Sequence, residues 1–231
     1  MSLTVENLSF SYEKHEVLHE ISFTAQAGEL LAILGPNGVG KTTLFKCVMG
    51  LERRYTGKIL ADGVDLSALS PRERAHRVAA IPQAHPLSFR YSAFDMVLMG
   101  TSHTLSPFNL PGEKERAAAR AAMERVNISH LAERPFDHLS GGEQQRIAIA
   151  RAIVNSPSLV IADEPTGNLD PETSMEIMEI FQEINNTGTT IIMATHDKEI
   201  VDAMGKRVIA IEHGEIVRDE LNGVYGYESE Q

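Results

Sequence analysis

The sequence of 231 residues lacks the features of several protein classes. Its single cysteine, Cys47, excludes an internal disulfide, and the apolar neighbours Phe45 and Val48 indicate a buried structural thiol. No apolar run approaches the ~18 residues of a membrane span, and the N-terminus has no basic–apolar–small signal pattern. We therefore predict a cytosolic protein that acts at a membrane only through a partner.

The sequence also lacks an excess of basic residues. Its formal net charge is −11, and the acidic residues are spread along the chain. Nucleic acids and anionic membranes attract proteins with basic patches, so we predict no nucleic-acid partner, although a short basic strip occurs at 72–77. Internal repeats and low-complexity segments are absent, and the length suits one domain or a domain with a subdomain.

The most informative stretch is a glycine-rich run that follows the apolar segment 30–34 and precedes a helix-like segment at 44–49. It satisfies G-x-x-x-x-G-K-[ST] in a strand–loop–helix context, which favours a nucleotide site over an ordinary glycine-rich turn. Glycines let successive backbone N–H groups point into one concavity, and a helix N-terminus adds positive potential. We expect Lys41 to bind the outer phosphates and Thr42 to ligate Mg²⁺. The predicted phosphate-binding residues are Gly35, Pro36, Asn37, Gly38, Val39, Gly40, Lys41, Thr42 and Thr43.

A second stretch with carboxylates suits the attack of water on the γ-phosphate of a nucleotide. The apolar run 158–162 ends in Asp163 and Glu164, which predicts a buried parallel strand with two acids at its carboxyl end. There Asp163 can hold the Mg²⁺ shell, and Glu164 can orient or deprotonate a water for attack on the γ-phosphate. A structural pair of surface acids is the weaker alternative.

Four other residues in two stretches suit a phosphate site because of their place in the chain. Ser140 is a good N-cap for a helix at 143–154, and Gly141 and Gly142 leave N–H groups approachable, which makes a second anion site. His196 follows a covered strand at 189–194 and can reach the same γ-phosphate edge as Glu164. Taken alone, most Ser-Gly-Gly-Glu strings are ordinary helix starts, and a lone histidine is usually a packing or surface residue.

The remaining pattern predicts an α/β core with a helical insertion. Ser70 and Pro71 mark a helix start, Asp170 caps a helix at 172–184, and the segment from Ala84 to His138 is helical in character. This insertion is either an interaction surface or a simple helical cap. Further strands are expected at 3–10, 17–18, 21–23, 57–61, 78–81, 207–211 and 215–217, and the insertion's helices at 92–99, 113–126 and 128–132.

The order of these motifs resembles that of ABC-transporter ATPase subunits over nearly the whole chain. The resemblance implies an α/β P-loop NTPase core with a mainly parallel sheet, an N-terminal antiparallel β subdomain and an inserted helical subdomain. The core would comprise 1–83 and 139–231, and the helical subdomain 84–138. It also implies ATP and Mg²⁺ as ligands, ATP hydrolysis as the activity, and a place on the inner face of the cell membrane through an integral membrane permease.

The resemblance assigns roles to individual residues. Tyr12, which alone reads as a loop aromatic, matches the aromatic that stacks on adenine. Gln83 matches the glutamine that touches Mg²⁺ and water and senses the membrane partner, and Asp170 lies in the loop that links two sites. Asp163 and Glu164 match the magnesium-associated aspartate and the catalytic glutamate, and His196 the switch histidine. Ser140, Gly141 and Gly142 match the signature motif, which completes the site of a second copy in a head-to-tail dimer.

The two ends of the chain resemble different subfamilies. Residues 1 to about 140 resemble ATPases of iron–siderophore, haem and cobalamin importers, chiefly at 69–73, 81–83 and 94–100. From Gln144 onward the chain resembles the cell-division ATPase whose permease regulates peptidoglycan hydrolases, chiefly at 162–173, 194–201, 218–220 and 225–227. We therefore consider a recombined or engineered chain joined near the signature motif, and natural drift of an importer ATPase as the alternative.

Three functions follow from these resemblances. The first is the energy-coupling subunit of an importer for metal chelates or cobalamin, and the second is a cell-division module that signals through a permease. The third is an ABC ATPase that acts in DNA repair or on ribosomes without a permease. The third is disfavoured because the surface charge is wrong for nucleic acid.

Overall fold

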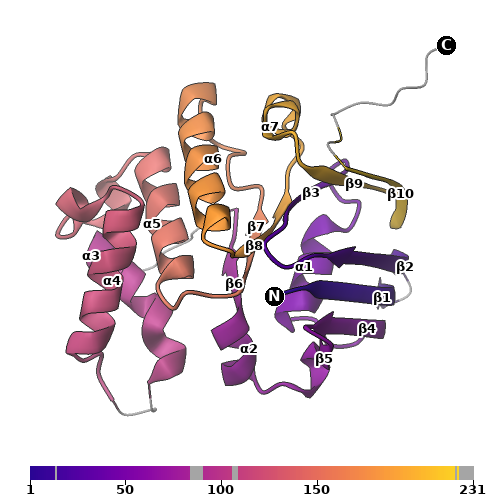
Figure 1. The fold of residues 1–231 in the computed structure, drawn as a ribbon, viewed down its shortest axis with the longest axis horizontal. Helices are drawn as coiled ribbons and strands as arrows, with labels where there is room; N and C mark the ends of the chain where they lie inside the picture. The colour runs from indigo at the N-terminus through magenta and orange to yellow at the C-terminus, as the bar shows by residue number, and fades with distance from the viewer. Residues whose placement is uncertain (14, 84–90, 106–108, 222, 224–231) are drawn as a thin grey trace.

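The computed structural model describes residues 1–13, 15–83, 91–105, 109–221 and 223. Two β-sheets and the helices around them form the architecture, with the larger sheet at the centre (Figure 1). The helices α3, α4 and α5 lie together on one side of this sheet, and the smaller sheet lies on the other. The predicted α/β core with an antiparallel β part and a helical part is confirmed.

The six-stranded central sheet has the order β10-β9-β3-β8-β7-β6. All neighbouring pairs are parallel except β9 and β10. Burial of β3 and β8 along their whole length explains why their sequences are apolar runs rather than alternating ones. The strands are β3 (Leu30–Leu34), β6 (Val78–Ile81), β7 (Leu159–Asp163), β8 (Thr190–Ala194), β9 (Arg207–Glu212) and β10 (Glu215–Glu220).

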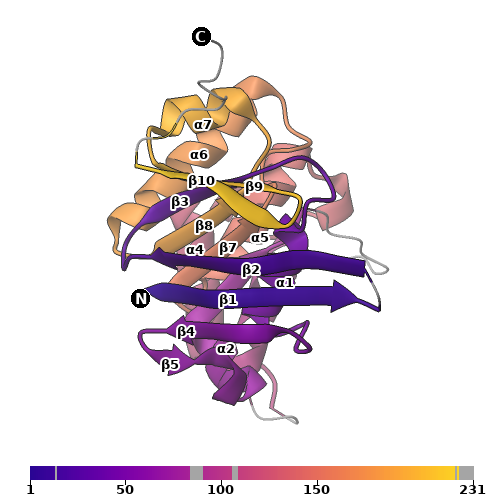
Figure 2. The same cartoon turned by 90° about the vertical axis from the view of Figure 1, so that its right-hand side faces the viewer.

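The four-stranded sheet is antiparallel, in the order β2-β1-β4-β5, and it faces the viewer in Figure 2. Helix α1 (Lys41–Met49) packs between the two sheets, because its Leu44 and Phe45 share one buried cluster with residues of both. The strands are β1 (Leu3–Tyr12), β2 (His15–Ala25), β4 (Thr56–Ala61) and β5 (Val64–Asp65).

Helices on the opposite side form a second buried cluster with the central sheet. Ser140 begins α5 with a reciprocal capping box, as its predicted N-cap role requires, and Ser92 begins α3 in the same way. The helices are α2 (Pro71–Arg77), α3 (Ala93–Leu98), α4 (Glu113–Arg125), α5 (Gly141–Ile153), α6 (Pro171–Asn186) and α7 (Lys198–Met204). No helix in the described ranges is long and apolar enough to cross a membrane.

Several predicted boundaries are wrong. The short strands expected at 17–18 and 21–23 are parts of the one strand β2, whose pairing with β1 contains register shifts and whose Glu20 has φ 46°. These bulges interrupt the alternation that marks a strand. Helix α5 begins at Gly141 rather than at 143, and 128–132 forms only the 3₁₀ turn Ser129–Leu131. The predicted segment 225–227 and parts of the insertion lie outside the described residues.

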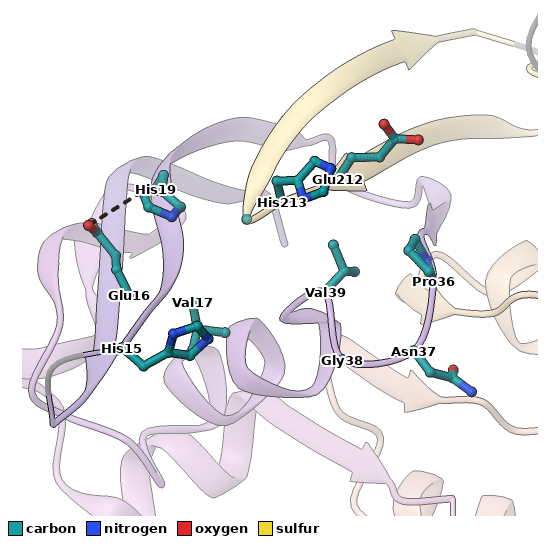
Figure 3. A pocket seen from close by; sticks show the side chains of 11 residues that line it. His15, Glu16, Val17, His19, Pro36, Asn37, Gly38, Val39, Glu212 and His213 are labelled. Atoms are coloured by element: carbon teal, nitrogen blue, oxygen red, sulfur yellow. Dashed lines mark ion pairs between the residues drawn. The ribbon is translucent and has the colours of Figure 1, made fainter.

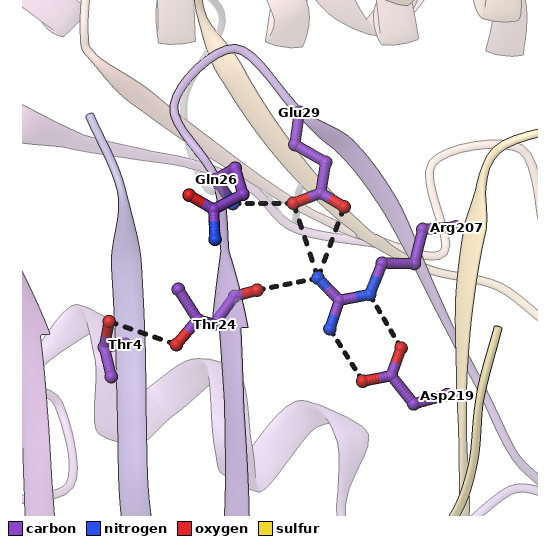
Figure 4. Close-up of polar contacts among 6 residues, drawn as sticks. All are labelled: Thr4, Thr24, Gln26, Glu29, Arg207 and Asp219. Carbon is purple, nitrogen blue, oxygen red and sulfur yellow. Dashed lines mark hydrogen bonds and ion pairs between the residues drawn. The ribbon is translucent and has the colours of Figure 1, made fainter. Parts of the chain in front are cut away.

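One arginine joins the two sheets (Figure 4). Arg207, at the start of β9, forms two hydrogen bonds with Asp219 at 2.7 and 2.6 Å and donates to the Thr24 carbonyl at the end of β2 at 2.7 Å. Its third partner is Glu29, at 3.3 Å. The hydrogen bonds to Asp219 raise the pKa of Arg207 above its ordinary value, so the guanidinium group stays charged.

The single cysteine lies on the buried face of α1. Burial, with a smaller effect from Glu52, raises the pKa of Cys47 to about 12. A thiol reacts as its thiolate, so we expect Cys47 in the native protein to resist a disulfide reagent at pH 8 for hours and to react within minutes in denaturant. Absorbance of the released thiolate measures this, and rapid labelling without denaturant would contradict the burial of this helix face.

Candidate functional site

The glycine-rich loop at 35–40 connects β3 to α1, as the motif predicts. Gly40 is the N-cap of α1 with φ 111°, and a Cβ there would lie 2.7 Å from Leu18 Cδ2 and 3.0 Å from the Val17 carbonyl oxygen. Only glycine satisfies both demands. No side chain in the described part of the chain caps α1, so the first N–H groups of this helix remain available to an anion.

Lys41 turns back onto its own loop. Its Nζ donates to the carbonyl oxygens of Gly35 at 2.6 Å and Pro36 at 3.1 Å, and it lies 3.8 Å from Glu164 Oε1. Burial lowers the pKa of Lys41, while the carboxylates of Glu164 and Asp163 oppose this change. Two neutral carbonyl oxygens and one carboxylate therefore hold the ammonium group. The charged oxygens of a phosphate can take the place of the carbonyl oxygens as stronger partners.

The side chains of Thr42 and Asp163 contact each other at a place that suits a magnesium ion. Thr42 Oγ1 donates to Asp163 Oδ2 over 2.8 Å. Adjacent oxygen ligands of an octahedral Mg²⁺ ion with ~2.0–2.1 Å bonds lie about 2.9 Å apart, so the spacing of these two oxygens fits such an ion. Phosphate and water would supply its other ligands. Burial raises the pKa of Asp163, and the hydrogen bond from Thr42 counters this effect. A bound cation would favour the ionised carboxylate.

Glu164 is the centre of the site. Its Oε1 lies 3.2 Å from His196 Nδ1, and its Oε2 accepts a hydrogen bond from Gln83 Nε2 at 3.1 Å. The backbone of Glu164 has φ 49°, a left-handed conformation that is unfavourable for a non-glycine residue and that often occurs at functional sites. Its N–H donates to the Ala194 carbonyl at 2.9 Å, which ties the ends of β7 and β8 together.

A cavity of about 300 Å³ lies over the start of α1. The structure thus brings six of the nine predicted phosphate-binding residues together with Gln83 and Glu164, which come from the ends of β6 and β7, whereas Gly35, Pro36 and Val39 do not line this cavity. This is the edge where parallel sheets bind their ligands. The cavity is lined by Asn37, Gly38, Gly40, Lys41, Thr42, Thr43, Gln83 and Glu164.

The predicted second anion site lies apart from this cavity. Ser140 caps α5 by accepting from the Glu143 N–H, and Gly141 and Gly142 pack against Leu169 and Thr173 at the start of α6. Asp170 caps α6, and the Thr173 N–H lowers its pKa. None of 140–142 lines the cavity at Lys41, so one chain does not bring the two anion sites together.

A second, larger cavity of about 670 Å³ adjoins the outer side of the phosphate loop (Figure 3). It shares Asn37 and Gly38 with the first cavity and is otherwise bounded by β2 and the turn between β9 and β10. Local sequence patterns do not predict this wall, because the segments that form it are far apart in the chain. His15, Glu16, Val17 and His19 line it from β2, Pro36 and Val39 from the loop, and Glu212, His213 and Gly214 from the turn.

Tyr12 lies in neither cavity lining. It is the last residue of β1, 40% exposed, with its ring edge-on to Phe10 at 4.8 Å and its hydroxyl 3.5 Å from Glu52 Oε1. Its predicted stacking on adenine therefore stays a prediction. An exposed aromatic ring with one weak polar contact is available for such stacking.

The fold and the site together define a P-loop ATPase with strand-end acids beside a phosphate loop. The sequence matches the family described as ABC transporter over residues 18–167. The chain belongs to the ABC transporter ATPase family, whose members hydrolyse ATP, generally with Mg²⁺.

Several relatives that align along nearly the whole chain are named for cell division. The cell division ATP-binding protein FtsE of Bacillus subtilis is 43% identical over 217 residues, which are 91% of this chain and 92% of that protein. FtsE of Mycobacterium tuberculosis is 38% identical over 233 residues, 98% of this chain and 99% of its own. These alignments run through both predicted parts of the chain, so a junction near residue 140 finds no support.

Solved structures share the fold. A transporter described as of the metal-chelate type, in an inward-facing conformation, has a TM-score of 0.84 at 30% identity, covering 96% of this chain and 83% of that one. The dimeric bacterial ABC transporter cassette MJ0796 has a TM-score of 0.83 at 27% identity, covering 96% of this chain and all of that one. The predicted likeness to importers of iron–siderophores, haem or cobalamin rests on structural neighbours such as the metal-chelate type transporter.

Proposed function

We propose that this chain is the ATPase of a cell-division ABC system, in which ATP binding signals through a permease to enzymes of the cell wall. The observation that carries the proposal is the 43% identity to Bacillus subtilis FtsE over nine-tenths of both chains. The import of iron–siderophore, haem or cobalamin, which the first 140 residues favour, is the second candidate, supported by the similarity to a metal-chelate type transporter.

In the proposed mechanism the residues at Lys41 bind the phosphates and those at Glu164 act on water. The N–H groups at the start of α1 and the Lys41 ammonium hold the β- and γ-phosphates. Thr42 and Asp163, with Gln83 nearby, would hold Mg²⁺, which offsets charge on the transferring phosphoryl group. Glu164 orients the attacking water, and His196 donates to the developing charge.

The second copy supplies the missing anion site. Ser140, Gly141 and Gly142 lie outside the Lys41 cavity of their own chain, so we propose that they close on the nucleotide of a head-to-tail partner. Asp170, packed beside them at the start of α6, would link the two sites. The dimeric form of the cassette MJ0796 supports a dimer here. Gln83, joined to Glu164 and followed by the helical insertion, would report the state of the site to a permease.

The identity of the permease tests the proposal. The tagged full chain is expressed in its native host with the substitution Glu164→Gln, and the membranes are solubilised with Mg·ATP present. We expect it to co-purify with a four-span permease. Mass spectrometry of the detergent-solubilised complex identifies the partner, with Lys41→Ala as the control that cannot form the ATP-bound state. Recovery of a many-span importer permease and a solute-binding protein instead would favour the second candidate.

A further inference from the structure

A buried arginine lies at the end of α1 opposite the phosphate-binding residues. Arg74, on α2, is only 6% exposed, although arginine is rarely buried this far. Its guanidinium lies against Gly50, the C-cap of α1, so closely that any side chain on Gly50 would overlap it. Its Nη2 donates to the Leu66 carbonyl, and its Nε is buried without a hydrogen-bond partner in the described ranges.

This position suits the electrostatics of α1. The C-terminal end of a helix carries partial negative charge, which a cation stabilises. The nine residues of α1 span about 13 Å, with Lys41 and Thr42 at one end and Gly50 at the other. The guanidinium group at Gly50 therefore restrains the position of the whole helix. It thereby restrains where Thr42 Oγ1, in the first turn, lies relative to Asp163.

Arg74 also connects α1 to the segment that carries Gln83. Helix α2 ends at Arg77 and passes directly into β6, and Gln83 follows β6 by two residues. The Val78 N–H donates to the Arg74 carbonyl, so the backbone at Arg74 is part of this junction. Gln83 in turn donates to Glu164. The segment 71–83 thus contacts α1 at one end and the reacting edge of the site at the other.

We propose that Arg74 is a positioning residue of the nucleotide site, which fixes α1 and the Gln83 segment relative to each other. This inference rests on the proposed nucleotide site at Lys41 but not on the cell-division role. Loss of Arg74 then changes nucleotide binding and turnover in molecules that are still folded. Loss of an arginine that only joins the two sheets changes stability alone.

The test compares Arg74→Met with Arg207→Met in the full chain. Methionine keeps much of the apolar volume and removes the charge in both variants, and Arg207 joins the two sheets outside the site. At a temperature well below both unfolding midpoints, we expect Arg74→Met to weaken Mg·ATP binding and kcat/KM by about tenfold, within the range of couplings carried through packed contacts. Arg207→Met should lower the unfolding midpoint but leave the Mg·ATP affinity within twofold. A fluorescent ATP analogue gives the affinity.

Cys47 gives an independent readout, because it lies on the last turn of α1. We expect Arg74→Met to speed the labelling of Cys47 under native conditions and Arg207→Met to leave it unchanged. If Arg74→Met does not fold, Arg74→Lys serves, since it keeps the charge but lacks the geometry to contact both Gly50 and Leu66; a threefold loss of affinity is expected.

Two results separate the possible failures. Wild-type affinity, kcat/KM and Cys47 labelling in folded Arg74→Met, or in Arg74→Lys where the first variant is unfolded, would overturn the positioning role. Unchanged Mg·ATP binding in Lys41→Ala would instead overturn the nucleotide site on which the inference rests.

Discussion

Replacement of Glu164 by glutamine is expected to leave ATP binding intact and to lower turnover by about 10²–10⁴-fold, the usual contribution of a positioned general base. Glutamine keeps the shape of the side chain and its contact with Gln83, but it cannot take a proton from water. It also removes a negative charge that lies 3.8 Å from Lys41 Nζ and would repel the triphosphate. ATP affinity should therefore be equal to or higher than that of the wild type.

Slow hydrolysis has a visible consequence for assembly. With the nucleotide retained, two Glu164→Gln chains should remain closed on two Mg·ATP and elute as a dimer in size exclusion, while the wild type returns to monomer as ATP is consumed. Glu183→Gln, on the exposed face of α6, is the matched control and should behave as wild type. Hydrolysis at the wild-type rate in Glu164→Gln would refute the assignment of this residue.

Replacement of Lys41 by alanine is expected to weaken ATP binding itself. The side chain is 6% exposed, and its ammonium is positioned at the mouth of the phosphate loop by the carbonyls of Gly35 and Pro36. Hydrogen bonds to a charged group contribute about 1.5–3 kcal/mol, so the dissociation constant should rise about 10- to 150-fold. Isothermal titration calorimetry of the folded variant with Mg·ATP measures this change.

The direction of the Lys41 effect differs from that of Glu164. Lys41→Ala should fail to dimerise at ATP concentrations that saturate the wild type, because the site no longer retains the nucleotide. Lys58→Ala, an exposed lysine of β4, is the control for the loss of one positive charge. Equal affinities of wild type and Lys41→Ala would count against a phosphate-binding role for this lysine.

The position of the site could be predicted because parallel strands place their carboxyl ends together. Three strands end at these side chains: β7 at Asp163, β6 two residues before Gln83 and β8 two residues before His196. The apolar runs identify the three strands as buried and parallel, which places their carboxyl ends at one edge of the sheet. The contacts of Glu164 with Lys41, Gln83 and His196 are the result. The left-handed backbone of Glu164 could not be predicted, because the neighbouring residues in the sequence do not indicate a strained conformation there.

Other features depended on information that local patterns do not carry. Helix α7 was missed, although Asp197, whose side chain accepts from the Glu199 and Ile200 N–H groups, was an N-cap signal. The burial of Arg74 runs against the preference of charged residues for the surface, so only the packing of α2 on α1 reveals it. Importer-like motifs in the first half favoured an importer ATPase, whereas the alignment of about nine-tenths of the chain with Bacillus subtilis FtsE supports the alternative, a cell-division ATPase.

The place of α1 between the two sheets links the folding of this protein to its ligand. The helix that begins with the phosphate-binding residues also supplies buried side chains to the cluster shared by both sheets, so an unfolded chain cannot keep any part of the nucleotide site. A nucleotide that binds only the native state adds RT ln(1 + [L]/Kd) to the free energy of unfolding, about 4 kcal/mol at a thousandfold excess over Kd. In a cell with ample ATP, the bound nucleotide therefore stabilises the native state as well as serving as substrate, and its depletion would leave the chain more prone to unfolding and proteolysis.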